Sequence, residues 1–469
     1  MSAVGSILTN SGALTALQSI AQTSQTTNQL QNELASGLSI SSPSDNPAGY
    51  ITAQGFTSQI NGLTQATSNA NQGVSLLQTA QGAIGQQISV VQQLNSIAVQ
   101  AANSTQTPAE LQSLQTLTGQ LTQQVSTIAT QTQFNNINLL DGSFSGQFQI
   151  GANAGQTLTF GINSTTADDL GMWSAGASSA ATSSVYTPGT GAVDVNINGT
   201  DIGVAANAAS GAAIAKDINA QAGTTNVEAV ASTTNSATYT VTADTAAFTL
   251  NSSASAVSGT PGAGVTITAP TGTATTTLGA IVTAINAKTS TTGIKASGSG
   301  TSLTLTQESG KNITFGGTPA GIQYNGTTVA VKSVQQAAIQ LQSSASFSAS
   351  GLSASATATP SKATQTSLNE IDVTSLPGAT KAINVVKYAL QGLNNQAGKL
   401  GADQQRMTAT INNLNSTTTN ATTALGVVQD ANIPAVANQL TQAQIQAQSG
   451  VAALKSSTEL QQTYLSLLP

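Results

Sequence analysis

The stretch INGLTQATSNANQGVSLLQTAQGAIGQQISVVQQLNSIAVQA, residues 60–101, decides the fold because its apolar and small residues recur in alternating steps of three and four. The stripe on these steps runs through Ile60, Leu63, Thr67, Ala70, Val74, Leu77, Ala80, Ile84, Gln87, Val91, Leu94, Ala98 and Ala101. This heptad-like spacing predicts one long helix with a narrow apolar face. Periodic patterns longer than about 25 residues are typical of rods and coiled coils.

Similar stripes lie outward from this stretch at both ends of the chain. The first occupies residues 1–34, and Gly37, Pro43 and Pro47 interrupt it before the long stripe begins. A helix is also expected from Leu111 to Ile128, with Thr107 as its N-cap. In the last zone, residues 378–469, the stripe loses its phase around Asp430 to Pro434 and then resumes.

Neither end can complete a core alone, because each presents only a narrow apolar stripe. We therefore expect the two ends to pack together as a helical bundle, and copies of the chain to bury the outer stripes. Contacts of that kind that do not close generate helical filaments. The residues expected at this assembly interface are Leu14, Leu17, Leu30, Leu34, Leu77, Ile84, Val91, Leu94, Leu121, Leu400, Met407, Ile411, Leu414, Leu425, Val436, Leu440, Val451, Leu454, Leu465 and Leu468.

The middle zone, about 141–377, has a different pattern that predicts short strands. It is rich in Thr, Ser, Ala and Gly and alternates as in Val193, Val195 and Ile197. An internal repeat aligns IAKDINAQAGTTNVEA, residues 214–229, with IVTAINAKTSTTGIKA, residues 281–296. Each unit predicts a short amphipathic helix followed by a strand. The fold class is therefore α+β, with long terminal helices and β-rich inserted domains.

The composition excludes most kinds of catalytic site. The 469 residues include no His and no Cys, and only 6% are charged. Imidazole proton transfer, thiolate zinc sites and thiol nucleophiles are thus excluded. The net charge of −6, with every Lys and Arg at or after Lys216, argues against nucleic acid as a partner. We predict no enzyme activity, no cofactor and no metal.

Three local features have a plain structural interpretation. Asp45-Asn46-Pro47 is a turn signal rather than a calcium site. Asp168-Asp169 is a carboxylate pair without a third acid or base nearby in sequence, so a metal or acid–base site there is disfavoured. The start MSAVGSILTN lacks the basic and long apolar regions of a secretory signal, and no run of 18 apolar residues predicts membrane insertion.

The chain resembles bacterial flagellin over about its first 165 and last 90 residues. The N-terminal resemblance rests on LTALQSI, LASGLSISSPSDNPAGY, ANQGVSLLQTAQGAI, IAVQAANST and the long QTQFNNINLLDGSFSGQFQIGANAGQT, residues 131–157. The C-terminal resemblance rests on INNLNSTTTNATTALGVVQDANIPAVANQLTQAQIQAQSG and the ending YLSLLP. The two middle repeats are similar to a short inserted motif of flagellin variable regions.

The resemblance implies a domain organisation. Residues 1–47 and 430–469 would form an inner-tube helical domain with its connecting segments, and 48–165 and 378–429 an outer-tube helical domain. A β-hairpin is expected near Leu139 to Ile162. Residues 166–377 would form variable surface domains, with repeats near 193–250 and 271–316.

The resemblance also implies a function: an extracellular structural subunit that polymerises into the flagellar filament for swimming motility. The implied partners are other copies of the chain, hook–filament junction proteins, the filament cap and an export chaperone at the C-terminal helix. Export without a cleaved signal peptide is implied as well. The alternatives are a hook–filament junction protein, which shares the helical ends, and a surface adhesin that binds through the β-rich middle.

One departure from the family pattern concerns charge. Outer-tube helices of the family usually carry several Arg and Glu residues, whereas this chain has Gln92, Gln93 and Asn95 in the equivalent stretch. Gln, Asn, Ser and Thr form hydrogen bonds that do not titrate. We therefore expect a filament that tolerates acid, because few groups link its stability to proton uptake.

Overall fold

The computed structural model describes residues 10–176, 193–204, 211–231, 235–242, 247–253, 264–268, 273–308, 311–317, 321–324, 327–329, 334–335, 339–350 and 361–466. Two compact units divide the chain. The first comprises Met1–Gln78, Ser145–Gly161 and Gly401–Pro469, and the second comprises Thr79–Phe144 and Ile162–Leu400.

Long helices form both ends of the described chain, as the stripes predict. They are α1 (Ser11–Ser36), α2 (Pro47–Ala101), α3 (Pro108–Gln131), α8 (Leu376–Gln429) and α9 (Ile433–Ser466). The breaks fall where Gly, Pro and Asx residues interrupt the periodicity, after Ser36 and after Gln429. The predicted α+β class, with terminal helices, a hairpin and a β-rich middle, is confirmed.

In the first unit, a β-hairpin packs on α2. Its strands, β3 (Ser145–Gln149) and β4 (Thr157–Gly161), are antiparallel, and Phe148 stacks on Phe160 with ring centroids 5.1 Å apart. The Asn69 side chain of α2 donates to the Gln149 carbonyl at 3.1 Å. A Cβ at Gly73 would lie 2.6 Å from the Met407 methyl of α8, so α2 and α8 approach closely there. A side chain at position 73 would make the Met407 methyl move.

In the second unit, α3 begins at the predicted cap. The Thr107 hydroxyl accepts from the Glu110 amide, and the Glu110 carboxylate accepts from the Thr107 amide at 2.7 Å. Gln87 of α2 is fully buried, and its Nε2 donates to the carbonyls of Val125 and Thr165, both at 3.0 Å. This amide thus joins α2, α3 and the segment that follows the hairpin. A short ribbon, β1 (Gln133–Phe134) and β2 (Ile137–Asn138), follows α3.

The first β-rich module belongs to the second unit and consists of two sheets around one core. The sheet orders are β21-β5-β18-β8 and β20-β19-β6-β7. Its elements are β5 (Gly171–Gly176), β6 (Val193–Ile197), β7 (Thr200–Val204), α4 (Gly211–Ala220), α5 (Ala222–Thr225), β8 (Glu228–Ala231), β18 (Ile339–Ser343), β19 (Ser348–Ser350), β20 (Ser361–Lys362) and β21 (Thr364–Ser367). The core includes Ile197, Ile218, Val227 and Leu341. The short helix η1 (Leu368–Glu370) leads to α8.

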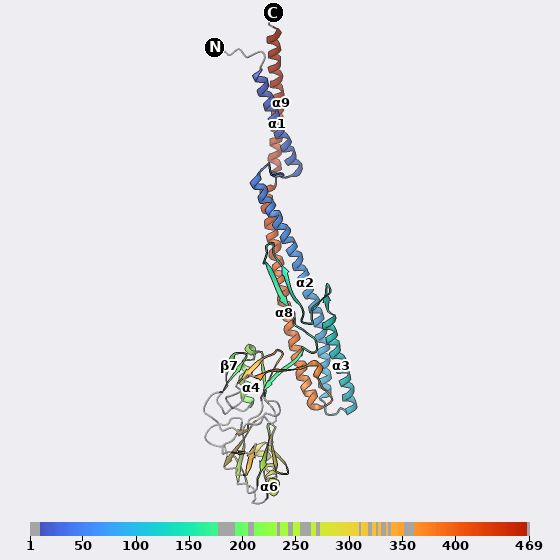
Figure 1. Ribbon diagram of the computed structural model, residues 1–469, viewed down its shortest axis with the longest axis vertical. Helices are drawn as coiled ribbons and strands as arrows, with labels where there is room; N and C mark the ends of the chain where they lie inside the picture. Colours follow the sequence, from blue (N-terminus) through green and yellow to red (C-terminus); the bar gives the residue numbers. More distant parts are fainter. Residues whose placement is uncertain are drawn as a thin grey trace. The chain divides into compact units, whose positions relative to one another are not determined.

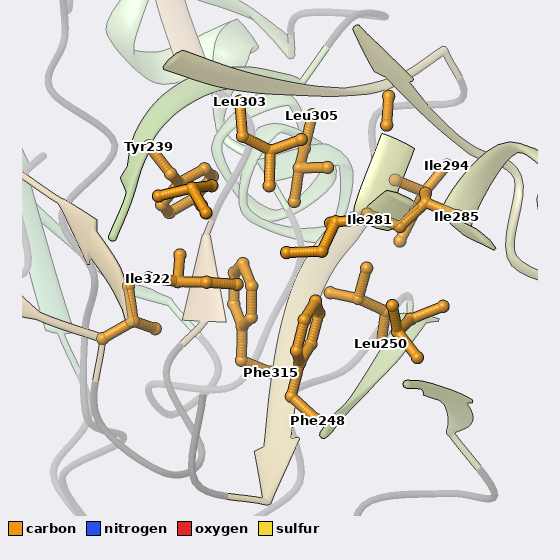
Figure 2. Close-up of a cluster of buried hydrophobic side chains, with 14 of the residues drawn as sticks. Tyr239, Phe248, Leu250, Ile281, Ile285, Ile294, Leu303, Leu305, Phe315 and Ile322 are labelled. Atoms are coloured by element: carbon orange, nitrogen blue, oxygen red, sulfur yellow. The ribbon is translucent and has the colours of Figure 1, made fainter. Parts of the chain in front are cut away.

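The second β-rich module lies between β8 and β18 in the sequence. Its sheets have the orders β11-β10-β14-β17 and β12-β13-β9-β15-β16. Its elements are β9 (Asn235–Val241), β10 (Phe248–Ser253), β11 (Val265–Ile267), α6 (Ala274–Asn286), α7 (Thr289–Thr292), β12 (Ile294–Ser299), β13 (Ser302–Gln307), β14 (Asn312–Gly317), β15 (Ile322–Tyr324), β16 (Thr327–Thr328) and β17 (Val334–Gln335). Figure 2 shows its core, where Tyr239, Phe248 and Phe315 face Ile281 and the leucines of β13.

The repeat boundaries expected from sequence, 193–250 and 271–316, divide these cores differently. β6, β7, α4 and β8 pack in the first module, whereas β9 and β10, which fall inside the expected first repeat, pack in the second. The helix-then-strand pattern of each repeat is present as α4 with β8 and α6 with β12.

Candidate assembly surface on the terminal helices

Helix α1 carries its own start and stop signals. The Asn10 side chain accepts from the Ala13 amide at 3.0 Å, which caps the first turn. Gly37 ends the helix with φ of 72°, and its amide donates to the Glu33 carbonyl. Only one of the residues of α1, Glu33, is ionisable. The helix is therefore a nearly uncharged rod whose surface is set by its apolar positions.

Helices α1 and α9 lie side by side and antiparallel (Figure 1). Near one end, the Asn10 Nδ2 donates to the Ser457 carbonyl at 3.3 Å, and the Ser457 hydroxyl donates to Asn10 Oδ1 at 3.2 Å. Near the other end, Leu30 packs on Val436 and Ala443. Between them, a Cβ at Gly450 would lie 2.9 Å from Ile20 Cγ1.

The connecting segments extend this pairing beyond the helices. Leu38 forms an antiparallel bridge with Asp430, and the Ser39 amide donates to the Gln429 carbonyl at 2.8 Å. On the other side of the bridge, the Ala431 amide donates to the Gly37 carbonyl at 2.9 Å. The two breaks predicted from sequence thus lie against each other.

Asp45 holds the turn that leads to α2. Its carboxylate accepts from the amides of Ser42 and Ser41 at 2.8 and 2.9 Å and from the Ser41 hydroxyl. These bonds, the Ser42 amide first, lower the pKa of Asp45 because they stabilise the charged form. Asn46 then caps α2 by accepting from the Gly49 amide at 2.9 Å. This sequence is a turn, as predicted.

Large apolar side chains remain exposed on both helices of the pair. Leu14 and Leu17 of α1 are 61% and 51% exposed, and Ile445, Val451 and Leu460 of α9 are 58%, 56% and 55% exposed. Exposed leucines are unremarkable singly, but here they recur on adjoining helices that have few charges. The helix pair thus presents apolar surface that the described residues do not cover.

The residues predicted at the assembly interface fall into distinct groups. Ten are buried within the chain: Leu30, Leu77, Ile84, Val91, Leu94, Leu121, Leu400, Met407, Leu414 and Val436. Four are half-buried: Ile411, Leu425, Leu440 and Leu454. Leu14, Leu17, Leu34 and Val451 are exposed. The Leu465 side chain and Leu468 lie outside the described part of the chain.

Sequence reasoning missed the polar and small residues that set the register of the helix pair. Asn10 and Ser457 are 447 positions apart, and no local pattern connects them. Gly450 interrupts an apolar stripe and is recognisable only as a helical glycine. The spacing within each stripe does not show which turns of the two helices meet.

The described residues offer no cluster for metal binding. Among them, no group of three or more His, Cys, Asp or Glu side chains is placed to hold a metal ion. Asp169 accepts from Ser164 and Thr166 within a local turn, whereas Asp168 accepts from the distant Asn369 side chain of η1. Both carboxylates thus have structural hydrogen-bond partners. Within the same residues, no helix is both long and apolar enough to cross a membrane.

Family comparisons match both ends of the chain and part of its middle. Residues 7–145 match the bacterial flagellin N-terminal helical region, and residues 383–468 match the bacterial flagellin C-terminal helical region. Residues 253–315, which lie in the second β-rich module, match the flagellin hook IN motif.

Two individual proteins align with the chain over nearly its full length, and a solved structure aligns with 71% of it. Polar flagellin C of Vibrio parahaemolyticus is 27% identical over 98% of this chain and 99% of its own. B-type flagellin of Pseudomonas aeruginosa is 29% identical over 98% of this chain and 99% of its own. The solved structure of FliC from Burkholderia pseudomallei covers 71% of this chain and 99% of its own at 19% identity, with a TM-score of 0.30.

Proposed function

The chain belongs to the bacterial flagellin family, and from this membership we propose how its terminal helices build a polymer. It is a structural subunit of the bacterial flagellar filament. We propose that copies assemble by burying the exposed apolar faces of α1 and α9 against one another. The observation that carries this proposal is the set of large apolar side chains that the described residues leave exposed on the helix pair: Leu14 and Leu17 on α1, and Ile445, Val451 and Leu460 on α9.

The hydrophobic effect supplies the driving force. Full burial of a Leu, Ile or Val side chain stabilises by about 1.5–3 kcal/mol relative to exposure. Leu14, Leu17, Ile445 and Val451 are each more than half exposed, so each has most of that contribution still available. The ordering of the helix ends on assembly opposes it. Several such residues on each copy are therefore needed for a stable polymer.

The interface that we propose works without charge pairing. The charged side chains of α9 are Lys455 and Glu459, whose Nζ and Oε1 atoms lie 4.0 Å apart. The charged side chain of α1 is Glu33. Exposed ion pairs of this kind contribute about 0–1 kcal/mol. The ten buried residues of the predicted interface then serve the fold of each copy, and the exposed group serves contacts between copies.

The remaining partners follow from family membership alone. We propose that the filament joins the hook through junction proteins, ends in a cap, and is supplied by subunits exported without a cleaved signal peptide. A chaperone would cover the C-terminal helix before export, since Ile445, Val451 and Leu460 expose apolar surface in the free chain.

Substitution of the exposed leucines tests the proposal. Leu14→Gln with Leu17→Gln should raise the critical concentration for polymerisation at least tenfold while the monomer keeps its helix content. Val230→Gln, a change at a 45% exposed site on β8, is the matched control and should leave polymerisation unchanged. Normal assembly of the double variant would refute the proposed contact.

Removal of residues 1–34 distinguishes a filament subunit from a free-standing binding protein. The shortened chain should remain monomeric at concentrations where the full chain forms tubular filaments in electron micrographs. Filaments formed by the shortened chain would contradict the role of α1.

A further inference from the structure

The two β-rich modules share one order of elements. In the first module the order is β5, β6, β7, α4, α5, β8, β18, β19, β20, and in the second it is β9, β10, β11, α6, α7, β12, β13, β14, β17. The sheets agree as well. The order β20-β19-β6-β7 corresponds to β17-β14-β10-β11, and β5-β18-β8 corresponds to β9-β13-β12. Strands β21 and β15 hold the same sheet position, beside β5 and β9, but β21 follows β20 in the chain whereas β15 precedes β17. Strand β16 has no counterpart.

Side-chain hydrogen bonds repeat in matching positions. Asn219 clamps the backbone of Ala229 by accepting from its amide at 2.6 Å and donating to its carbonyl at 2.9 Å. Asn286 does the same to Ala296, with both distances 2.8 Å. An Asn that bonds both backbone groups of a residue ten positions later is not required by a helix-and-strand packing in general. The shared hydrogen bonds favour duplication of one ancestral module over convergence of two unrelated modules on the same fold.

The turn between helix and strand repeats too. The Thr225 hydroxyl donates to the Gln221 carbonyl and accepts from the Val227 amide. The Thr292 hydroxyl donates to the Lys288 carbonyl and accepts from the Ile294 amide. The residue after each Thr is left-handed, Asn226 with φ of 55° and Gly293 with φ of 67°.

One connection differs between the modules. In the second module, β12 and β13 are joined directly, with Ser299 paired to Ser302 around the turn Gly300–Thr301. In the first module, the equivalent strands β8 and β18 pair in the same register, Ala229 with Leu341 as Ala296 with Leu305. Residues 232–338, which contain the whole second module, stand in place of the four residues 299–302.

We infer that the β-rich region is one module inserted into a copy of itself, and that the turn Gly300–Thr301 is a second acceptor site of the same kind. The guest it fits is a folded domain whose two ends lie side by side. The Cα atoms of opposed residues in an antiparallel pair are about 4.5–5.5 Å apart. A guest whose two ends are separated by a similar distance can therefore join β12 to β13 without forcing these strands apart. Residues 299–301 are exposed, which leaves room for it.

Two variants of the full chain test the inference. In the first, residues 232–338 are deleted and Ala231 is joined to Ile339 through Ser-Gly-Thr-Ser, the sequence of residues 299–302 that joins the equivalent Gly298 and Leu303 in the second module. Trp173, the single Trp of the chain, packs against the core of the first module and reports on it. Its emission should stay at the native wavelength and shift only on denaturation. A matched deletion of residues 228–338 also removes β8 and should give the emission of the unfolded chain.

In the second variant, a small monomeric domain with adjacent termini is inserted between Gly300 and Thr301. The guest and both modules should unfold cooperatively in calorimetry, and Trp173 emission should be unchanged. Loss of the native Trp173 emission in the 232–338 deletion would overturn the inference. So would protease sensitivity of the second module in the insertion variant beyond that of the native chain. Both readouts are independent of polymerisation, so failure of the proposed function would not imitate either result.

Discussion

The close contact between Gly450 of α9 and Ile20 of α1 allows a test of how these two helices pack. A Cβ added at Gly450 would lie 2.9 Å from Ile20 Cγ1 and 3.7 Å from Ile20 Cδ1. Cγ1 moves only by rotation about χ1, and a β-branched side chain in a helix strongly prefers one χ1 rotamer. Gly450→Ala should therefore force the two helices apart or move Ile20 from its rotamer.

Two opposing effects set the magnitude. Replacing Gly by Ala in a helix interior contributes about 0.8–1.0 kcal/mol of stability. Overpacking a tight contact costs about 1–3 kcal/mol. If overpacking costs only about 1 kcal/mol, the propensity gain nearly cancels it in the Gly450→Ala variant. A double-mutant cycle is therefore needed to separate the two effects. With Ile20→Ala in place, Gly450→Ala should show the propensity gain alone.

The assay is the critical concentration for filament growth, in which about 1.4 kcal/mol is a factor of ten. The native chain, Ile20→Ala, Gly450→Ala and the double variant should give a coupling of about 1–3 kcal/mol. Gly55→Ala in α2 is the control, because nothing lies within 4 Å of its added Cβ. If Gly450→Ala stabilises as Gly55→Ala does, whatever stands at position 20, the helix register is wrong.

Three further outcomes follow from the structure. Gln87→Ala should lower the free energy of unfolding by about 2–4 kcal/mol in denaturant titrations, because two buried carbonyls lose their donor, whereas exposed Gln86→Ala should change it by less than about 0.5 kcal/mol. The Glu228 carboxylate accepts hydrogen bonds from Lys387 and Tyr388. These bonds, that of Lys387 first, lower the pKa of Glu228 below 4.5. The stability that the charged carboxylate contributes is therefore present above pH 4.5 and is lost as the pH falls through the pKa of the folded protein. Glu228→Gln should therefore be less stable than the native chain at pH 7, by Trp173 emission in denaturant, with a gap that closes in acid; a gap independent of pH would contradict this. Filaments should persist from pH 7 to pH 3 in light scattering, because α1 and α9 carry only two carboxylates between them, Glu33 and Glu459. Dissociation as steep as that of a charge-rich flagellin would count against the acid-tolerance hypothesis.

Local patterns predicted the helices and their ends because the physical cause is local. The steps of three and four from Ile60 to Ala101 place one face against a core, and α2 covers that stretch. Thr107, Pro108 and Glu110 form the capping box within four residues of sequence. The same holds for the two repeats, whose helix and strand are adjacent in the chain.

Pairings between distant residues left no such signal. Leu30 and Leu34 belong to one stripe, yet Leu30 is 7% and Leu34 is 37% exposed, because periodicity identifies a face and not its partner. Strand β8 pairs with β18, which follows only after the whole second module. The three-dimensional core, and not proximity in the sequence, decides which strand pairs with β8. The repeat expected at 193–250 therefore included strands that belong to two different modules.

The most direct test of the proposed assembly contact uses the absence of Cys from the chain. A single Leu14→Cys places a thiol on the exposed face of α1, and Lys295→Cys places one on the exposed strand β12 as a control. Maleimide should label both sites rapidly in monomers. In filaments, the rate at position 14 should fall at least tenfold while the rate at position 295 stays high. Equal labelling of position 14 in monomers and filaments would contradict burial of α1 between copies.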